Sequence, residues 1–409
     1  MTEPFDGPTV RDVLTRVAPL AERFHGVGRR VHLVGGVVRD LLIGRPADDL
    51  DLTTDARPDE TKRLVSGWAD DVWSQGERFG TIGCRRGDDV FEITTYRAED
   101  YDPTSRRPVV EFGDTLEGDL VRRDFTINAM ALDPLDGSLV DPHGGRGDLA
   151  AGILRTPGPP DVSFDDDPLR MLRAARFVAR FGLTPDDALL GSMRRHAPRL
   201  DIVSAERIHD ELLKLLGGPD PAAGLGLLAE VGLLERFLPE AVVDDAVLAR
   251  LRPDPLLRLA ALVRQTDRDR LLRRARALRM SKDETSTLVR LVSVGSSALV
   301  HDAPFDDRAV RRLAVAAGTR LDEVRELVRA VDPHRGAAVD AAVDDLAARE
   351  DLHPDRVVDG AAVQRALGIA PGREIGEALR FLDQLRIEHG PLAEADQLAR
   401  LREWWSARG

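Results

Sequence analysis

Hydrophobic and polar positions follow two different patterns along the chain. Before about residue 150, short apolar runs are separated by glycine-rich turns, a pattern typical of strands mixed with helices. The runs predict strands at residues 31–34, 50–53, 72–73, 81–85 and 90–96, and apolar positions three and four apart predict helices at 11–28, 38–43 and 60–65. This part of the chain is therefore expected to form a mixed sheet with helices.

Helical spacing dominates the rest of the chain. From residue 164 onward, apolar positions recur three and four residues apart, and Gly and Pro separate the stretches. The pattern predicts helices over residues 165–181, 204–216, 222–237, 246–251 and 256–278, and mostly helical sequence as far as Trp405. No strand is expected after Val140. The predicted fold class is α+β, with an N-terminal head of mixed sheet and helices followed by an all-α region.

Composition limits the binding sites, the cysteine chemistry and the cellular compartment that we expect for this chain. The 409 residues carry a formal net charge of −13, so any site for a polyanion such as RNA must be a local basic patch. A single cysteine, Cys84, excludes an intrachain disulfide and a cysteine-based metal cage. The chain has neither a long apolar stretch nor a signal-peptide pattern at its start, so we expect a cytoplasmic protein with no membrane partner.

Candidate chemistry begins in the segment LVGGVVRDLLIGRPADDLDL, residues 33–52. A Gly-Gly pair ending at Gly36 closes a predicted strand and opens a helix, where the missing side chains let a triphosphate approach backbone N–H groups. Arg39 follows three residues later, within reach of a phosphate. Asp49 and Asp51 lie two apart on the next strand and point to the same face, where two carboxylates suit a divalent cation such as Mg²⁺.

This arrangement resembles the DNA polymerase β nucleotidyltransferase superfamily, and more narrowly the class II CCA-adding enzymes and bacterial poly(A) polymerases. Three further segments carry the resemblance: RRDFTINAM at residues 122–130, DDPLRMLRAARF at 166–177, which is similar to the family's EDxxR helix, and SAERI at 204–208 with Glu211 and Leu212. The resemblance is strong over residues 30–240 and fainter beyond. One departure is Asp166, which stands where the family has the longer Glu.

Asp167 and Arg170 can also be interpreted from hydrogen-bond chemistry. In the predicted helix 165–181, residues three apart share one face, which puts a carboxylate acceptor beside a guanidinium donor. Cytosine and adenine offer an amino group beside a ring acceptor, whereas guanine and uracil offer a carbonyl beside a ring N–H. The pair is therefore expected to accept C and A without a nucleic-acid template. The alternative interpretation is a surface ion pair of little consequence.

The resemblance implies template-independent addition of C, C and A to the 3′ end of tRNA from CTP and ATP, with release of pyrophosphate. It implies that Asp49 and Asp51 are catalytic and hold Mg²⁺, and that Gly36, Arg39 and Arg123 bind the triphosphate. The expected partners are tRNA, ATP and CTP, and not DNA. The sequence does not determine the oligomeric state.

Further expectations concern the remaining arginines and the domain bounds. Arg173 and Arg176 continue the face of Arg170 at three-residue steps and are expected to bind the triphosphate or the RNA end. Glu92, on the predicted strand 90–96, is a candidate third carboxylate of the metal site. The expected domains are a nucleotidyltransferase head at 1–150, a nucleotide-selecting neck at 151–240, a body at 241–330 and a tRNA-binding tail at 331–409.

Several alternatives remain at this point. A poly(A) polymerase of the same family and a tRNA nucleotidyltransferase that adds only CC or only A share most of these motifs. The segment 98–112, which resembles the flexible loop of full CCA-adding enzymes and looks complete, favours CCA over CC. A non-catalytic RNA-binding relic is the alternative from another class, and the intact Asp49 and Asp51 argue against it.

Overall fold

The computed structural model describes residues 7–46, 49–97, 113, 115–301, 304–352 and 357–408. Contacts divide the chain into two compact units. The first comprises Met1–Ser204 with Leu227–Leu233, and the second comprises Ala205–Gly226 with Leu234–Gly409. The predicted loop at residues 98–112 lies outside the described residues, so its completeness stays a prediction, as do the bounds of head, neck, body and tail.

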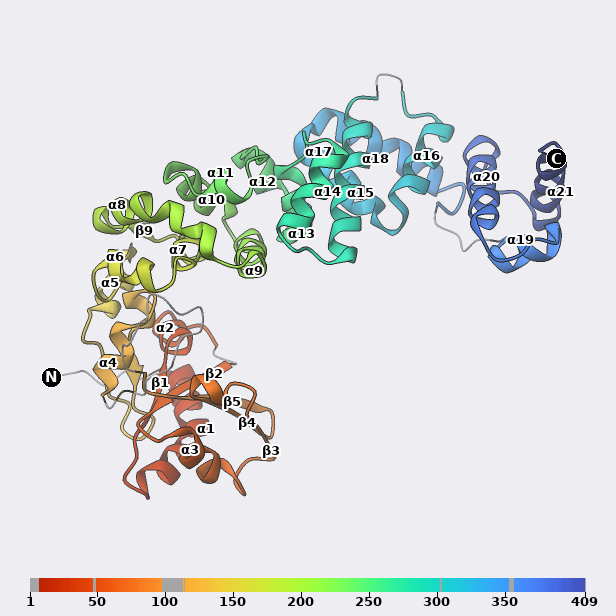
Figure 1. Cartoon of the computed structure of the whole chain (residues 1–409). Coiled ribbons are helices and arrows are strands. Elements are labelled where there is room, and N and C mark those ends of the chain that lie inside the picture. Colours follow the sequence, from red (N-terminus) through yellow and green to blue (C-terminus); the bar gives the residue numbers. More distant parts are fainter. Residues whose placement is uncertain are drawn as a thin grey trace. The chain divides into compact units, whose positions relative to one another are not determined.

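A seven-stranded sheet forms the centre of the head (Figure 1). The strands run in the spatial order β3 (Asp71–Trp73), β4 (Thr81–Arg86), β5 (Asp89–Thr95), β2 (Asp49–Thr54), β1 (Val31–Val34), β6 (Ala131–Leu132) and β7 (Leu139–Val140). Within this sheet, the described strand pairs are antiparallel except β2 with β5, which is parallel. The predicted mixed sheet is therefore confirmed, and the predicted strands agree with the observed ones to within about two residues.

Alternation along β2 separates the two faces of this sheet. Leu50 and Leu52 are each 1% exposed and lie in the core, whereas Asp49 and Asp51, which alternate with them, are exposed. The core also contains the apolar faces of three helices, α1 (Pro8–His25), α2 (Gly36–Leu42) and α3 (Pro58–Val65). Because successive strand residues point to opposite faces, packing these helices against the leucines leaves the aspartates on the other face.

The remainder of the first unit is built from short elements. They are α4 (Leu116–Val121), the 3₁₀ helix η2 (Thr126–Asn128), α5 (Gly145–Ala151), α6 (Pro160–Asp166), α7 (Arg170–Phe181), α8 (Asp187–His196) and the 3₁₀ helix η3 (Ala197–Ile202). Two strands of two residues each, β8 (Ile153–Leu154) and β9 (Thr184–Pro185), form a small parallel pair. The expectation of no strand after Val140 is therefore wrong, because elements this short carry no periodicity to detect.

Three helices expected to be continuous are each broken in two. The helix predicted at 165–181 is interrupted at Asp167, whose backbone is extended, because Pro168 disfavours a helical conformation in the residue before it. The helix predicted at 222–237 divides into α10 (Pro221–Glu230) and α11 (Leu234–Phe237) around Gly232, whose φ is +71°. The helix predicted at 256–278 divides into α13 (Pro255–Leu262) and α14 (Arg268–Ala277), and Asp267 caps the second piece.

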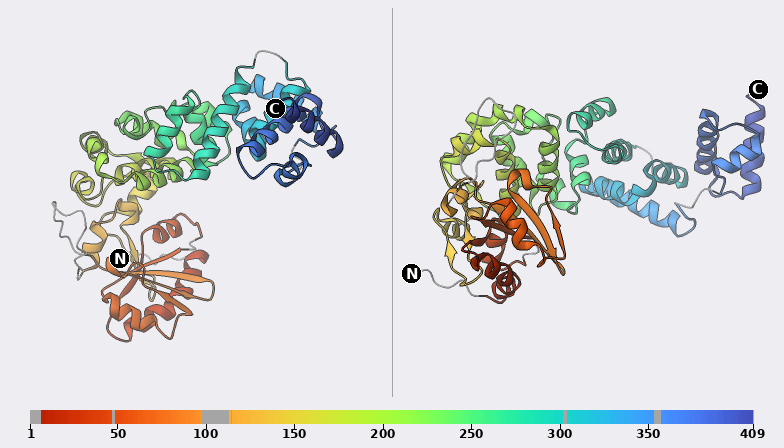
Figure 2. Two further views of the ribbon diagram at one scale, coloured as in Figure 1. Left: turned by 45° about the vertical axis from the view of Figure 1, so that its right-hand side comes forward. Right: turned by 60° about the horizontal axis from the view of Figure 1, so that its bottom comes forward.

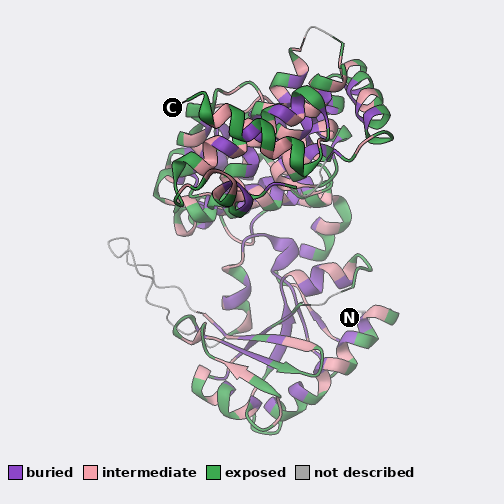
Figure 3. Ribbon diagram, turned by 90° about the vertical axis from the view of Figure 1, so that its right-hand side faces the viewer, coloured by how far each residue is buried: buried purple, intermediate pink, exposed green. Residues whose placement is uncertain are grey.

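The described part of the second unit is helical. Besides α11 and the first part of α10, its α-helices are α9 (Ala205–Leu216), α12 (Asp245–Arg250), α13, α14, α15 (Lys282–Leu299), α16 (Asp307–Ala317), α17 (Leu321–Val331), α18 (Pro333–Ala347), α19 (Gly360–Leu367), α20 (Arg373–His389) and α21 (Glu394–Ser406). The last three pack around Val363, Leu385 and Leu401 and form the blue cluster of Figure 2. Figure 3 shows buried residues on the inner faces of the helices and along the strands of the head. None of the described helices is long and apolar enough to cross a bilayer.

Candidate functional site

Three acidic side chains gather where β2 and β5 run side by side. Asp49 and Asp51 lie two apart on the exposed face of β2, and Glu92 on β5 is the direct register partner of Asp51. Among the described residues, none of the three takes part in a hydrogen bond or close ion pair. We refer to Asp49, Asp51 and Glu92 as the carboxylate edge.

The carboxylate edge concentrates negative charge. Desolvation by the surrounding protein raises the pKa of Asp51 to about 6, although the residue as a whole remains solvent accessible. Glu92 and Asp49 raise this pKa further, and the Arg123 guanidinium opposes them. Like charges this close disfavour ionisation, and a bound cation relieves that repulsion.

The donor set of this edge fits a divalent cation that also binds substrate. Among the described residues, no group of three or more His, Cys, Asp or Glu side chains is arranged to hold a metal ion by itself. Mg²⁺ in nucleotide enzymes commonly takes one or two carboxylates and completes its coordination with water and phosphate oxygens. Two aspartates on one strand face, with a glutamate beside them, match that incomplete protein contribution.

A glycine turn, Gly35 and Gly36, lies between β1 and α2. Gly35 has a φ of +73°, and a Cβ atom there would lie 3.0 Å from Nη1 of Arg123. A Cβ atom at Gly36 would lie 3.3 Å from Nη2 of Arg39. Side chains at either position would therefore crowd an arginine, so glycine keeps the turn open and lets both guanidinium groups approach it.

Asp119, on α4, holds Arg123 beside this turn. Asp119 is only 6% exposed, and its Oδ2 accepts a hydrogen bond from Nη2 of Arg123 at 2.9 Å. The same oxygen accepts from the hydroxyl of Thr53 at 3.3 Å, which ties α4 to the strand that carries Asp51. The sequence interpretation missed Asp119. The available signal was an acidic residue four positions before Arg123, a spacing that brings the two side chains together where the chain is helical.

Arg39 occupies the interior. It is 5% exposed, and its Nη1 donates to Oδ1 of Asn128 at 2.5 Å, while Nε donates to Asp40 at 3.0 Å. Its guanidinium carbon lies 4.5 Å from the centre of the Phe181 ring. Burial lowers the pKa of Arg39, and the Asp40 carboxylate opposes that shift. The predicted phosphate contact would require this side chain to leave these partners.

Two arginines of α7 are also bound within the protein. Nη1 of Arg170 donates to the Ser163 hydroxyl at 2.8 Å, and its Nη2 donates to the carbonyl of Arg122. Nε of Arg173 donates to Oδ2 of Asp124 at 2.9 Å. Burial would raise the pKa of Asp124, but the charge of Arg173 and hydrogen bonds from neighbouring groups outweigh it and lower this pKa.

Asp167 does not share a helix face with Arg170, so the geometric argument for the pair is wrong. Asp167 ends α6 in an extended conformation, and its Oδ1 accepts a hydrogen bond from the backbone N–H of Leu169 at 3.1 Å. The carboxylate therefore reaches its place through the turn at Pro168 instead of through helix periodicity. Arg176, one turn along α7, lies with its guanidinium carbon 4.8 Å from the centre of the Phe177 ring.

The contacts thus sort the predicted residues into two groups. Asp49 and Asp51 lie in the sheet, Arg123 follows the end of α4 beside the glycine turn, and Glu92 joins them. Arg39 belongs with the arginines of α7, since Asn128 and Asp124 connect it to Arg173. We refer to Arg39, Arg170 and Arg173 as the arginine cluster.

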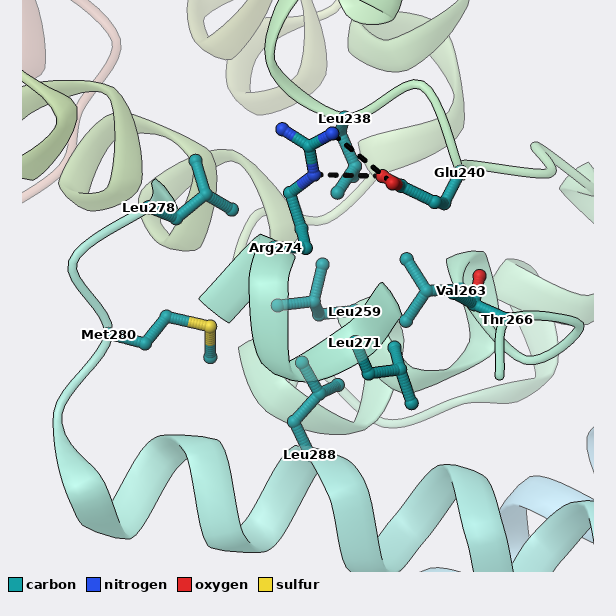
Figure 4. Close-up of a pocket in the computed structure, with 10 residues that line it drawn as sticks. All are labelled: Leu238, Glu240, Leu259, Val263, Thr266, Leu271, Arg274, Leu278, Met280 and Leu288. Atoms are coloured by element: carbon teal, nitrogen blue, oxygen red, sulfur yellow. Dashed lines mark hydrogen bonds and ion pairs between the residues drawn. The ribbon is translucent and has the colours of Figure 1, made fainter. Parts of the chain in front are cut away.

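A pocket in the second unit offers no comparable chemistry. Leu238, Leu259, Val263, Leu271 and neighbouring side chains line it, and the ion pair between Arg274 and Glu240 closes one side (Figure 4). Its volume of about 10 Å³ accommodates at most one water molecule. The pocket is a packing gap between helices.

Comparison with known proteins agrees with the resemblance seen in the sequence. The family described as poly A polymerase head domain matches residues 31–155, and the family described as probable RNA and SrmB-binding site of polymerase A matches residues 182–244. A CCA-adding enzyme of Streptococcus gordonii is 33% identical over 380 residues, which cover 89% of this chain and 91% of that protein. The chain belongs to the CCA-adding enzyme family.

Other members of this family show the same likeness. A CCA-adding enzyme of Geobacillus thermodenitrificans is 41% identical over 213 residues, which cover 52% of this chain and 51% of that protein. The crystal structure of the Bacillus stearothermophilus CCA-adding enzyme in complex with CTP superimposes with a TM-score of 0.70 at 27% identity, covering 98% of this chain and 99% of that one. The Thermotoga maritima CCA-adding enzyme complexed with tRNA shares the fold, with a TM-score of 0.67 at 20% identity over 98% and 96% of the two chains.

Proposed function

We propose that this protein adds C, C and A to the 3′ end of tRNA without a nucleic-acid template, using CTP and ATP and releasing pyrophosphate. The proposal rests on one observation: the first unit of the fold holds the carboxylate edge together with an open glycine turn and Arg123. Carboxylates suit the cations that accompany nucleotides, and a turn beside a guanidinium suits a triphosphate. The Streptococcus gordonii relative, matched over 91% of its length, bears the name of this activity.

Asp49 and Asp51 would hold the divalent metal, which we propose to be Mg²⁺, with Glu92 as a third carboxylate beside them. When bound, the metal would favour ionisation of the attacking 3′-hydroxyl and stabilise charge on the leaving pyrophosphate. The role of the protein is to orient both carboxylates on one strand face. Because both carboxylates project from one strand whose other face is packed, the sheet provides that orientation without further motion.

Gly36 and Arg123 would bind the triphosphate. Gly36 leaves the backbone N–H groups of the turn accessible, and Arg123 is held next to the turn by Asp119. Charge-assisted hydrogen bonds from a guanidinium to phosphate are among the strong ones in proteins. Arg39, the other arginine beside the turn, is held by Asn128 and Asp40.

Asp167 and Arg170 would read the base, as acceptor and donor toward cytosine or adenine. Arg170 would then exchange at least one of its contacts, to Ser163 or to the carbonyl of Arg122, for the base. Arg173 and Arg176, on the same helix, would bind the triphosphate or the RNA end. The reaction would take place in the cytoplasm, which supplies tRNA, CTP and ATP together.

The decisive experiment uses three tRNA transcripts, which lack CCA, end in C or end in CC, each incubated with one nucleoside triphosphate at a time. We expect C to be added to the first two and A only to the third, after which addition stops. A run of A on any RNA would make the protein a poly(A) polymerase instead. Addition of C to the first two transcripts without addition of A to the third, or addition of A to the third without addition of C to the first two, would make it a partial enzyme. Nucleotide binding without addition would indicate a relic.

A further inference from the structure

Arg39 connects two segments of the first unit that are far apart in the sequence. Its backbone belongs to α2, directly after the glycine turn, and its guanidinium lies over the ring of Phe181 at the end of α7, 4.5 Å from the ring centre. Phe177, one turn earlier on α7, lies 5.5 Å away on the same side. Because a planar cation on an aromatic face is favourable when desolvated, this contact holds α7 against α2.

A chain of hydrogen bonds forms a second connection between these helices. Nη1 of Arg39 donates to Oδ1 of Asn128, and Nδ2 of Asn128 donates to Oδ1 of Asp124 at 2.9 Å. Oδ2 of Asp124 accepts from Arg173 on α7 at 2.9 Å. Asn128 and Asp124 are 6% and 8% exposed, so each link is buried and costly to leave unpaired.

The guanidinium of Arg39 is therefore restricted in its ability to bind a phosphate group. One edge is bound to Asp40 and another to Asn128, and the plane is covered by an aromatic ring. A Cβ atom added at Gly36 would lie 3.3 Å from Nη2 of Arg39, so the guanidinium also packs against the glycine turn. These contacts use the planar fork of arginine, which lysine cannot reproduce.

We propose that Arg39 is a positioning residue that fixes helix α7 relative to the glycine turn, and that it governs nucleotide selection instead of binding phosphate. This inference rests on the function proposed above. Helix α7 begins with Arg170, so a shift of α7 displaces the base-reading residue from the nucleotide. Loss of Arg39 would then weaken discrimination between bases and leave the affinity for the phosphate groups nearly unchanged.

The test compares two variants that break the same contact from opposite sides, Arg39→Lys and Phe181→Leu. For both, we expect the ratio of kcat/KM for CTP to that for UTP to fall roughly 10-fold, while the inhibition constant of pyrophosphate changes less than about threefold. Arg180→Lys is the matched control. Arg180 lies over the same ring, 5.2 Å from its centre, but it is exposed and lies outside this hydrogen-bond chain, so the ratio should stay at the wild-type value.

Two outcomes would overturn the inference. If Arg39→Lys raises the pyrophosphate inhibition constant and the KM of all four nucleotides by one factor, while Phe181→Leu resembles wild type, Arg39 is a phosphate ligand. If both variants retain the wild-type CTP to UTP ratio, Arg39 does not position α7. Addition of C by the wild-type protein to a tRNA lacking CCA tests the proposed function separately. Should the wild type add nothing, the ratio of dissociation constants for CTP and UTP, measured without RNA, replaces the kinetic ratio.

Discussion

The carboxylate edge and the arginine cluster belong to the same unit of the fold but differ in how their charges are satisfied. At the edge, Asp49 and Asp51 are exposed and the pKa of Asp51 is raised to about 6. In the cluster, Arg39 is buried with partners on several sides, and Arg173 is paired with a carboxylate whose pKa is lowered. One group has charge left without a partner, and the other has nearly all of its charge compensated.

This difference distinguishes side chains that bind a ligand from side chains that keep the surrounding fold rigid. An uncompensated charge cluster costs stability, so it persists where a ligand of opposite charge supplies the missing partner. A compensated network contributes rigidity and fixes the directions of neighbouring side chains. We therefore expect substitutions at the edge to remove activity and spare the fold, and substitutions in and around the cluster to act through geometry and stability.

The largest effect is expected at the edge. Asp49→Asn and Asp51→Asn each keep the shape of the side chain and remove a metal-binding charge, so the rate of nucleotide addition should fall at least ~10²-fold. Because both residues are exposed, the far-ultraviolet circular dichroism and the melting temperature should stay close to wild type.

Asp88→Asn is the matched control for these variants, since Asp88 is an exposed aspartate of the turn between β4 and β5 in the same sheet. Its addition rate should equal that of wild type. A near-normal rate in Asp49→Asn or Asp51→Asn would remove the metal assignment and, with it, the contrast between the two groups.

A smaller effect is expected where the nucleotide meets α7. Asp167→Ala removes the acceptor for the amino group of cytosine or adenine, so discrimination against U and G should fall by about one to two orders of magnitude in kcat/KM. Asp165→Ala, a change of an exposed neighbour on α6, serves as the control. Unchanged ratios among the four nucleotides in Asp167→Ala would show that Asp167 has only a structural role at the turn.

The sequence predicted the edge better than the cluster. Asp49 and Asp51 could be predicted because their relation is local: two residues on one strand share a face whatever the rest of the fold does. The sheet and most helices of the head followed from the same local periodicity. The pairing of Glu92 with Asp51 needed the parallel register of β2 and β5, which no local pattern determines.

The cluster depends on contacts that are far apart in sequence. Arg39 and Asn128 are 89 residues apart, and Arg173 and Asp124 are 49 apart, so no spacing rule connects them. The break before α7 did have a signal, the proline at 168, but the apolar spacing on both sides suggested one continuous helix. Asp119 lay just outside the segments that resemble the family and was therefore not singled out.

A still smaller effect is expected at Asp119, which holds Arg123 and contacts Thr53 on the strand of the carboxylate edge. Asp119→Asn weakens the hold on Arg123 while Arg123 itself remains, so the KM for CTP and ATP should rise roughly 10-fold with little change in kcat. Glu117→Gln is the matched control, an exposed acidic residue on the same helix. If kcat falls while KM is constant, Asp119 acts on the metal-bearing strand through Thr53 instead of on the triphosphate through Arg123.

The smallest effect is expected in the stability of the cluster at low pH. The folded-state pKa of Asp124 lies below its unfolded value, so this carboxylate stabilises the fold above about pH 4, and the contribution is lost as the pH falls through the folded pKa. Asp124→Asn keeps an acceptor for Phe125 but loses the charge paired with Arg173, so at pH 7 the variant should be less stable by about 1 kcal/mol. Urea unfolding at several pH values measures this difference, which should shrink toward zero in acid because the wild-type carboxylate is then protonated as well. The difference in free energy of unfolding could instead stay constant down to the lowest pH at which the protein folds. Asp124 would then be needed for packing and not for charge compensation. The electrostatic contrast between the arginine cluster and the carboxylate edge would no longer hold.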